Sequence, residues 1–190
     1  MTYYQEITLL PDAEVSLYFL WSKVFAQVHL ALAAYKNENG VNTIGIAIPG
    51  YSEKGLGSKL RLMASEEALQ ALDIENRFQR LADYVHCTKV RPILQRRIRG
   101  YSVYSRYQPD EPAERKARRF IRRHEGISYE EALGRLKARK ETYRLPYITL
   151  RSGSSQQHFH LFIQKKTVDT PVAGTFSTYG LSPKTTVPEF

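Results

Sequence analysis

Sulfur, acidic residues and long apolar runs are all scarce in this chain of 190 residues. A single cysteine, Cys87, excludes an intramolecular disulfide and a thiolate-based zinc site within the chain. No apolar run approaches the roughly 18 residues of a membrane helix. The first residues have neither the basic region nor the small-residue cleavage site of a signal peptide. We therefore expect a cytoplasmic location and no membrane partner.

Motifs of several enzyme classes are missing as well. The glycines at 55 and 57 lack the spacing of a phosphate-binding P-loop, and residues 153–155 do not form a nucleophile elbow. No closely spaced carboxylate set suits a two-metal nuclease. His158 and His160 alternate on an expected strand, but no acidic residue or further ligand is near them in the sequence. We expect no metal and no cofactor.

Positive charge and apolar residues are what the chain has in quantity. Lys and Arg number 28 against 19 Asp and Glu, for a formal charge of +9. Hydrophobic residues make up 42% of the chain, so it can bury a core and is not disordered by composition. The excess charge favours a polyanionic partner, and nucleic acid is the first candidate.

Hydrophobic periodicity predicts a β-α-β-β-α-β order in the first half of the chain. Strands are expected at 3–9, 43–48, 59–64 and 85–90, and helices at 17–35 and after the capping residue Ser65. This is the ferredoxin-like order. Arginines become frequent after Pro92. The predicted fold class is therefore α+β, with a ferredoxin-like domain over 1–95 and a distinct C-terminal domain over 96–190.

A helix expected over 111–124 is the most informative segment of the C-terminal domain. Its apolar face is centred opposite a face that carries five arginines and no acidic residue, namely Arg115, Arg118, Arg119, Arg122 and Arg123. Such a face favours an external anion, and guanidinium groups suit phosphates. A merely soluble surface is the alternative interpretation, and charge alone does not separate RNA from DNA.

Other residues give weaker signals. Arg106 and Gln108 would project to one side of an extended backbone and could reach base edges together, although exposed polar pairs are common. His29 lies at the margin of the first helix's apolar stripe, as either a packed histidine or a proton-transfer group. Hydroxyls and amides at 152–157 could hold phosphate or ribose oxygens. Phe159 beyond them could stack on a base, although an ordinary hairpin loop with a core phenylalanine also fits.

Short motifs along the whole chain, specific in their order and spacing, resemble one known family. They are Leu10-Pro11-Asp12, His29, Ser105-Arg106-Tyr107-Gln108, Arg122-Arg123-His124, Thr149-Leu150-Arg151-Ser152, Gln157-His158-Phe159, Tyr179-Gly180-Leu181-Ser182 and Val187-Pro188-Glu189-Phe190. Together they resemble the CRISPR-associated endoribonucleases that process precursor CRISPR RNA in type I-F systems.

This resemblance implies how the RNA is bound and cut. The C-terminal domain would bind the repeat's stem-loop and lay its arginine helix in the major groove, while Arg106 and Gln108 read base pairs at the foot of the stem. Phe159 would stack on the terminal pair. Cleavage would occur at the 3′ base of the hairpin without metal, through attack of a ribose 2′-hydroxyl that leaves a 2′,3′-cyclic phosphate.

The resemblance also implies the roles of the site residues. His29 would be the general base, Ser152 would hold the attacking hydroxyl or its ribose, Tyr179 would orient the imidazole, and Ser154 would contact the same phosphate region. His160 is a second candidate for the proton-transfer role. The enzyme would stay on its product within a type I-F surveillance complex. The alternatives are a non-catalytic hairpin-binding subunit of that complex and, more distantly, a nonspecific basic RNA-binding module.

Overall fold

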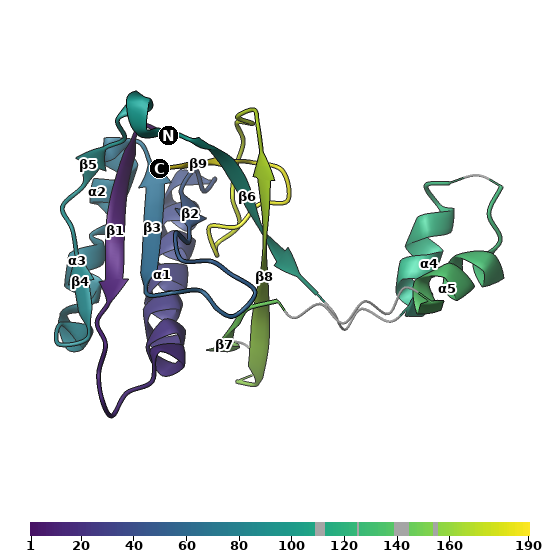
Figure 1. Ribbon diagram of the computed structural model, residues 1–190, viewed down its shortest axis with the longest axis horizontal. Coiled ribbons are helices and arrows are strands. Elements are labelled where there is room, and N and C mark those ends of the chain that lie inside the picture. The colour runs from purple at the N-terminus through teal and green to yellow at the C-terminus, as the bar shows by residue number, and fades with distance from the viewer. Residues whose placement is uncertain (109–112, 125, 139–144, 154–155) are drawn as a thin grey trace. The chain divides into compact units, whose positions relative to one another are not determined.

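The computed structural model describes residues 1–108, 113–124, 126–138, 145–153 and 156–190, which belong to two compact units (Figure 1). The core unit comprises Met1–Tyr107 and Leu145–Phe190, and the inserted unit comprises Gln108–Arg144. The fold is of the predicted α+β class, and its sheets are antiparallel.

The first sheet of the core unit comes from the N-terminal half of the chain. Its strands are β1 (Tyr3–Leu9), β2 (Gly45–Ala47), β3 (Lys59–Ala64), β4 (Val85–Cys87) and β5 (Arg91–Pro92). They pair in the order β2-β3-β1-β4, and β5 also pairs with β1. Buried Ile7 and Leu9 alternate with the more exposed Glu6 and Thr8, as expected of a strand with one face on the core.

Helix α1 (Leu17–Asn39) packs against this sheet and carries much of the core. Its start is capped by the side chain of Ser16, and it ends at Gly40, whose φ of 76° suits glycine. By length and mean hydropathy, α1 is apolar enough to cross a membrane, although no uninterrupted apolar run is present. Its inward stripe lies in the protein core: Leu20, Trp21, Val24, Phe25, Val28, Ala31 and Leu32.

Shorter helical elements follow β3. They are α2 (Glu66–Leu72), α3 (Ile74–Arg77) and the 3₁₀ turn η1 (Gln79–Leu81). The hydroxyl of Ser65 accepts a hydrogen bond from the backbone N–H of Ala68 at 3.3 Å, so Ser65 caps α2 as predicted. A second 3₁₀ turn, η2 (Gln95–Arg97), leads into the C-terminal half.

The second sheet of the core unit comes from the C-terminal half. Its strands are β6 (Gly100–Tyr107), β7 (Tyr147–Arg151), β8 (His158–Val168) and β9 (Val187–Glu189), in the order β7-β8-β6-β9. The register places Thr149 opposite His160 and Leu150 opposite Phe159. Neighbouring side chains on a strand point to opposite faces, so Phe159 shares the inner face with buried Leu161.

Both halves contribute to one core. The Tyr104 hydroxyl on β6 donates to the carbonyl of Ile48 at 3.2 Å, and the Tyr51 hydroxyl donates to the carbonyl of Ile163 at 2.9 Å. Burial raises the pKa of Tyr104, and the neighbouring Glu189 carboxylate raises it further. Each half has its own sheet, yet the two pack together. The division into domains at residue 95 stays a prediction.

The inserted unit contains two helices, α4 (Ala113–Ile121) and α5 (Tyr129–Ala138). The Ser128 hydroxyl accepts from the backbone N–H of Glu131 at 3.1 Å and opens α5 as a capping residue, as predicted. Helix α4 ends three residues before the predicted end at His124, while the predicted start, at 111, lies outside the described residues. It ends at Ile121, where a turn closes through a 3.0 Å hydrogen bond from the N–H of Arg123 to the carbonyl of Phe120.

Candidate functional site

His29 lies half-buried on α1, and its ring lies flat against that of Tyr179. The ring centroids are 4.2 Å apart and the planes differ by 8°. The Nδ1 atom of His29 is 2.9 Å from the backbone carbonyl oxygen of Thr178. Because a carbonyl oxygen only accepts hydrogen bonds, Nδ1 holds the proton, and in the neutral ring Nε2 carries the lone pair. The structure thus brings two predicted site residues together.

The ring of Tyr179 is aligned by α1 as well. Phe25 lies one helical turn before His29, and its ring is parallel to that of Tyr179 within 7°, with centroids 6.5 Å apart. Tyr179 therefore faces two rings of the same helix. This packing restricts rotation of both the tyrosine and the imidazole.

The segment Ser177–Leu181 carries both partners of the imidazole. Two backbone hydrogen bonds close it: the N–H of Ser177 donates to Leu181 at 2.8 Å, and the N–H of Gly180 donates to Ser177 at 2.9 Å. Gly180 has φ of 69°, and a Cβ atom there would lie 2.4 Å from a methyl group of Ile46. Glycine is required here by both the turn and the close approach.

Ser152 follows β7 in a short loop that its backbone closes. Its N–H donates to the carbonyl of Gln157 at 2.8 Å, and its carbonyl accepts from the N–H of Gln156 at 3.0 Å. Strand β7 is tied to α1 by a hydrogen bond between the hydroxyls of Thr149 and Tyr18. Ser154, also predicted to contact the RNA, lies outside the described residues.

Arg106 and Phe159 are neighbours on the inner face of the second sheet. The Arg106 guanidinium lies 5.5 Å from the centroid of the Phe159 ring, in a cation–π arrangement. Arg106 is exposed, so one side of its guanidinium can meet a ligand. Gln108 is exposed beyond the end of β6 and belongs to the inserted unit, so joint contact by Arg106 and Gln108 stays a prediction.

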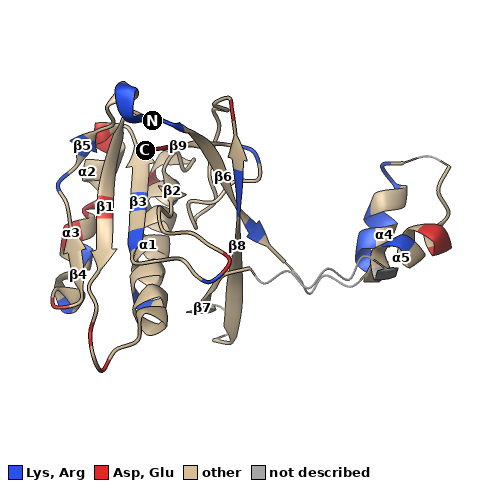
Figure 2. Ribbon diagram, in the orientation of Figure 1, with Lys and Arg blue, Asp and Glu red and all other residues tan. Residues whose placement is uncertain are grey.

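The predicted arginine cluster lies in the inserted unit, and all five of its side chains are exposed. Arg115, Arg118 and Arg119 are in α4, whereas Arg122 and Arg123 are in the turn after it. Figure 2 shows basic residues along α4 and also on β6 and β8 of the core unit. In the described parts of β6, β7 and β8 there is no acidic residue. The exposed arginines of the inserted unit thus provide groups that attract anions, whereas Lys165 on β8 is paired with Glu189 of β9 at 2.9 Å.

His160, the second candidate for proton transfer, lies in a different setting from His29. Its Nδ1 is 3.1 Å from the hydroxyl of Thr149, and its ring is 4.3 Å from that of Tyr147. A hydroxyl both donates and accepts, so this contact does not select one tautomer. Over the described ranges, no three His, Cys, Asp or Glu side chains gather as metal ligands.

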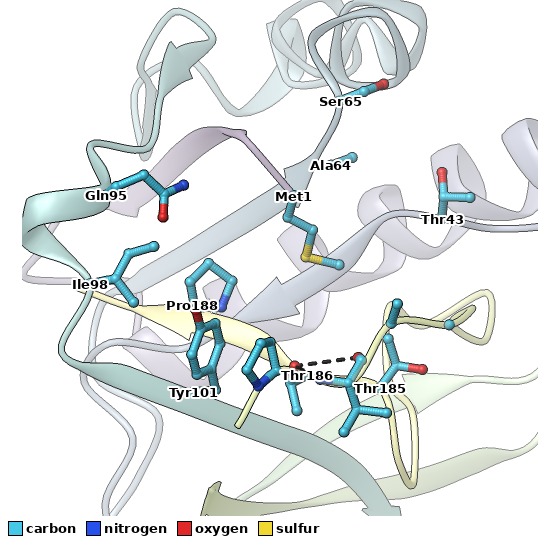
Figure 3. A pocket seen from close by; sticks show the side chains of 14 residues that line it. Met1, Thr43, Ala64, Ser65, Gln95, Ile98, Tyr101, Thr185, Thr186 and Pro188 are labelled. Atoms are coloured by element: carbon cyan, nitrogen blue, oxygen red, sulfur yellow. Dashed lines mark hydrogen bonds between the residues drawn. The ribbon is translucent and has the colours of Figure 1, made fainter. Parts of the chain in front are cut away.

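A cavity of about 530 Å³ lies elsewhere in the core unit. Figure 3 shows Met1, Tyr101 and Pro188 around it. Its lining residues include no acidic or basic side chain and none of the predicted site residues. The cavity therefore does not provide the charge complementarity that a polyanion needs.

Two contributors to the site gave no signal in the sequence. The Thr178 carbonyl is a backbone atom, which no residue type announces, and 149 positions separate it from His29. Asn42 donates its amide to the loop that carries this carbonyl, but in the sequence it looks like a turn residue, because it comes two positions after Gly40. Only the burial of Asn42, which is 1% exposed, marks it as unusual.

Comparison with known proteins assigns the chain to a family. The model of the family "CRISPR-associated protein (Cas_Csy4)" matches residues 4–190. The chain is 38% identical over 192 residues to the CRISPR-associated endonuclease Cas6/Csy4 of Escherichia coli UTI89, and 36% identical over 194 residues to the protein of that name from Pseudomonas aeruginosa UCBPP-PA14. Both alignments cover the whole of each chain. The chain therefore belongs to the Cas_Csy4 family, the CRISPR-associated endoribonucleases that process precursor CRISPR RNA in type I-F systems.

Proposed function

We propose that this protein binds the stem-loop of the CRISPR repeat and cuts precursor CRISPR RNA at the 3′ base of the hairpin without a metal ion. The observation that carries the proposal is the contact of His29 Nδ1 with the Thr178 carbonyl. It leaves Nε2 as the basic atom of the imidazole. Histidine is the side chain that most often serves as a general base in proton transfer.

The reaction is an internal transfer at phosphorus. Nε2 of His29 accepts the proton of a ribose 2′-hydroxyl, and the 2′-oxygen bonds to the adjacent phosphorus. The bond from phosphorus to the 5′-oxygen breaks, so the products are a 2′,3′-cyclic phosphate and a 5′-hydroxyl that takes up a proton. Ser152 holds the attacking hydroxyl or its ribose, and Tyr179, stacked on the imidazole, keeps the plane of that ring fixed.

Binding of the hairpin is assigned to the C-terminal half, residues 96–190. The exposed arginines 115, 118, 119, 122 and 123 bind phosphates along the major groove, and Ser154 adds a contact near the scissile phosphate. Arg106 and Gln108 read base pairs at the foot of the stem, and Phe159 stacks on the terminal pair. The close approach of Arg106 to Phe159 supports this division, because stacking and hydrogen bonding would then act on the same base pair.

The N-terminal half, residues 1–95, is assigned a ferredoxin-like fold. The antiparallel order β2-β3-β1-β4 with its two connecting helical segments supports that assignment. In the cell, we expect the protein to be cytoplasmic, to stay on the mature crRNA after cleavage, and to anchor that RNA in a type I-F surveillance complex. A surface of many phosphate contacts favours slow release.

The test uses a labelled repeat hairpin in excess EDTA, beside the same RNA with one 2′-deoxyribose at the cut position. Cleavage of the first RNA only, with a cyclic-phosphate end, is the expected result. Tight binding of both RNAs without cleavage would instead identify a non-catalytic hairpin-binding subunit. Equal affinity for the repeat hairpin and for unrelated RNA at raised salt would instead identify a nonspecific basic RNA-binding module.

A further inference from the structure

Asn42 is a buried polar residue that the proposed chemistry does not use. It lies between the end of α1 and β2 and is 1% exposed. Its Oδ1 accepts from the N–H of Ile44 at 3.0 Å, and its Nδ2 donates to the carbonyls of Ile44 at 3.2 Å and of Ser177 at 2.7 Å. Both donors of the amide are therefore engaged. Buried polar groups are retained when such bonds are made, and losing one partner is costly.

The contact of Asn42 with Ser177 is one residue away from the carbonyl that binds the His29 imidazole. The carbonyl of Ser177 accepts from Asn42, and the next carbonyl, that of Thr178, accepts from His29. The backbone of Asn42 adds a second bond at the same end of the loop, because its carbonyl accepts from the N–H of Phe176 at 2.9 Å. Asn42 thus anchors the loop at Ser177, directly before Thr178, whose carbonyl accepts the proton on Nδ1 of His29.

The far end of the loop has a separate anchor. The N–H of Ile46 on β2 donates to the carbonyl of Gly180 at 3.1 Å. With one anchor at each end, residues 177–180 are held against the segment 42–46, and the carbonyl of Thr178 has a fixed direction. Without the Asn42 amide, the turn's own backbone hydrogen bonds and the Gly180 anchor remain, but the Ser177 carbonyl loses its side-chain donor next to Thr178.

We propose that Asn42 is a positioning residue that, through the Ser177–Thr178 backbone, keeps His29 in the tautomer with Nδ1 protonated and Nε2 basic. The proposal rests on the proposed role of His29 as general base. A neutral imidazole without this carbonyl exchanges its proton between both nitrogens, and the tautomer with Nε2 protonated cannot accept the 2′-hydroxyl proton. Asn42 touches neither the imidazole nor the reacting atoms.

The direct test is Asn42→Asp in the full chain. Aspartate has the same shape, but when ionised it cannot donate to the Ser177 carbonyl. Asn39→Asp is the matched control, because Asn39 is exposed at the end of α1 and its amide donates to the Tyr35 carbonyl of the same helix, away from the loop. Three quantities are measured: the single-turnover cleavage rate, the Kd for the 2′-deoxy hairpin, and the ¹⁵N shifts of the His29 ring.

We expect Asn42→Asp to lower the cleavage rate about tenfold to a hundredfold, within the range that correct proton placement contributes in enzymes. The hairpin Kd should stay within about twofold of the wild-type value. The ¹⁵N shift of Nε2 should move from that of a nitrogen with a free lone pair toward the average of the two tautomers. Asn39→Asp should change none of the three.

Ser177→Ala is a second variant, which keeps the proposal testable if Asn42→Asp does not fold. Ser177 is exposed, and its hydroxyl accepts from the N–H groups of Tyr179 and Leu181 at 3.3 Å each. Its loss should loosen the same loop without opening the core. The rate should fall by a smaller factor, with the same direction of change in the Nε2 shift.

An unchanged rate and unchanged ¹⁵N shifts in a folded Asn42→Asp protein would overturn the proposal. So would unchanged shifts in Ser177→Ala if Asn42→Asp does not fold. Failure of the proposed function looks different, because the wild-type and Asn39→Asp proteins would then also fail to cleave the ribose-containing hairpin.

Discussion

A single imidazole joins an N-terminal helix to a C-terminal loop. His29 comes from α1, and the groups that orient it, the Thr178 carbonyl and the Tyr179 ring, come from the other end of the chain. Substitution of His29 and substitution of an exposed arginine should therefore have different effects. Under the proposed roles, loss of His29 should remove cleavage, whereas loss of an exposed arginine should weaken hairpin binding.

His29→Ala should lower the single-turnover cleavage rate by about 10² to 10⁴-fold while keeping hairpin affinity. General bases contribute about 10² to 10⁴-fold in rate, and His29 is not among the residues assigned to RNA binding. The measurement is a single-turnover assay beside a gel shift, with His160→Ala as the comparison. A stronger loss in His160→Ala would transfer the role of base to that residue, and loss of binding in His29→Ala would show that His29 is not purely chemical.

Arg106→Ala should weaken discrimination between the cognate hairpin and one with an altered base pair at its foot. The expected loss is about 1 to 3 kcal/mol for each bidentate contact removed. Competition binding with both hairpins measures it, and Arg151→Ala, an exposed arginine on β7, serves as the control. An equal loss of affinity for unrelated RNA would mean that Arg106 contacts only phosphate.

For single residues, the sequence predicted which positions matter better than it predicted which side chains and backbone atoms contact one another. The periodicity of α1 placed His29 at the margin of the buried stripe, where the structure has it half-buried. The pairing with Tyr179 was available only through the family resemblance. The Thr178 carbonyl could not be predicted, because backbone atoms have no residue signature and the contact depends on closure of the whole core.

At the scale of elements, β1 and β3 are joined by an ion-pair cluster. Glu6 on β1 lies 2.7 Å from the ammonium of Lys59 and 2.8 Å from the guanidinium of Arg61, both on β3. Burial disfavours ionisation of Glu6, but the hydrogen bonds from Lys59 and Arg61 outweigh it and lower its pKa below the ordinary value of 4.5. Arg61 also donates to the carbonyl of the last residue, Phe190, at 2.7 Å.

Glu6→Gln should destabilise the protein by about 1 kcal/mol at neutral pH, as expected for a partly buried ion pair. A carboxyl whose pKa is lower in the folded chain stabilises it above the unfolded value, and this contribution is lost as pH falls through the folded pKa. The difference between the two proteins should therefore be constant above about pH 5.5 and shrink toward acid. Urea unfolding across pH measures it, with exposed Glu38→Gln as the control. A difference that grows toward acid would contradict the assignment.

The sequence predicted long elements well and short ones poorly. Strands β1 and β3 have the predicted bounds, and α1 begins at the predicted Leu17, because each fills several periods of its own pattern. Strands β5 and β9 were not predicted. The three residues of β9 form a strand because they pair with Gly100–Ser102 of β6, and so distant a partner leaves no local pattern.

For the whole molecule, the attachment of the inserted unit is the feature with the clearest consequence. The chain leaves the core unit after Tyr107 and returns before Tyr147, and both residues pair with Phe162 of β8. Two strands that flank a third are about 10 Å apart. The core unit therefore holds both ends of the insertion next to one another.

Replacement of residues 109–143 by a short Gly-Ser linker should leave the core folded. The melting temperature should change by only a few degrees, because the sheet on either side of the junction is complete. Hairpin affinity should fall sharply, and its dependence on salt should weaken by about 0.7 to 0.9 in the log–log slope for each phosphate that is no longer neutralised. Thermal unfolding and Kd measured from low to high salt test both parts. An unchanged salt slope would show that the arginines do not bind phosphate.

An insertion with closely spaced ends can be exchanged as a cassette. Under the proposed division of labour, the cassette holds the groove contacts, while His29, Thr178 and Tyr179 remain in the part of the chain that surrounds it. When the stem of the CRISPR repeat RNA differs in length or helical shape, changes within the inserted unit alone would adapt the groove contacts to it. The groove contacts would then change without altering His29 and its partners, whereas Arg106 and Phe159, proposed to act at the foot of the stem, stay with the core unit.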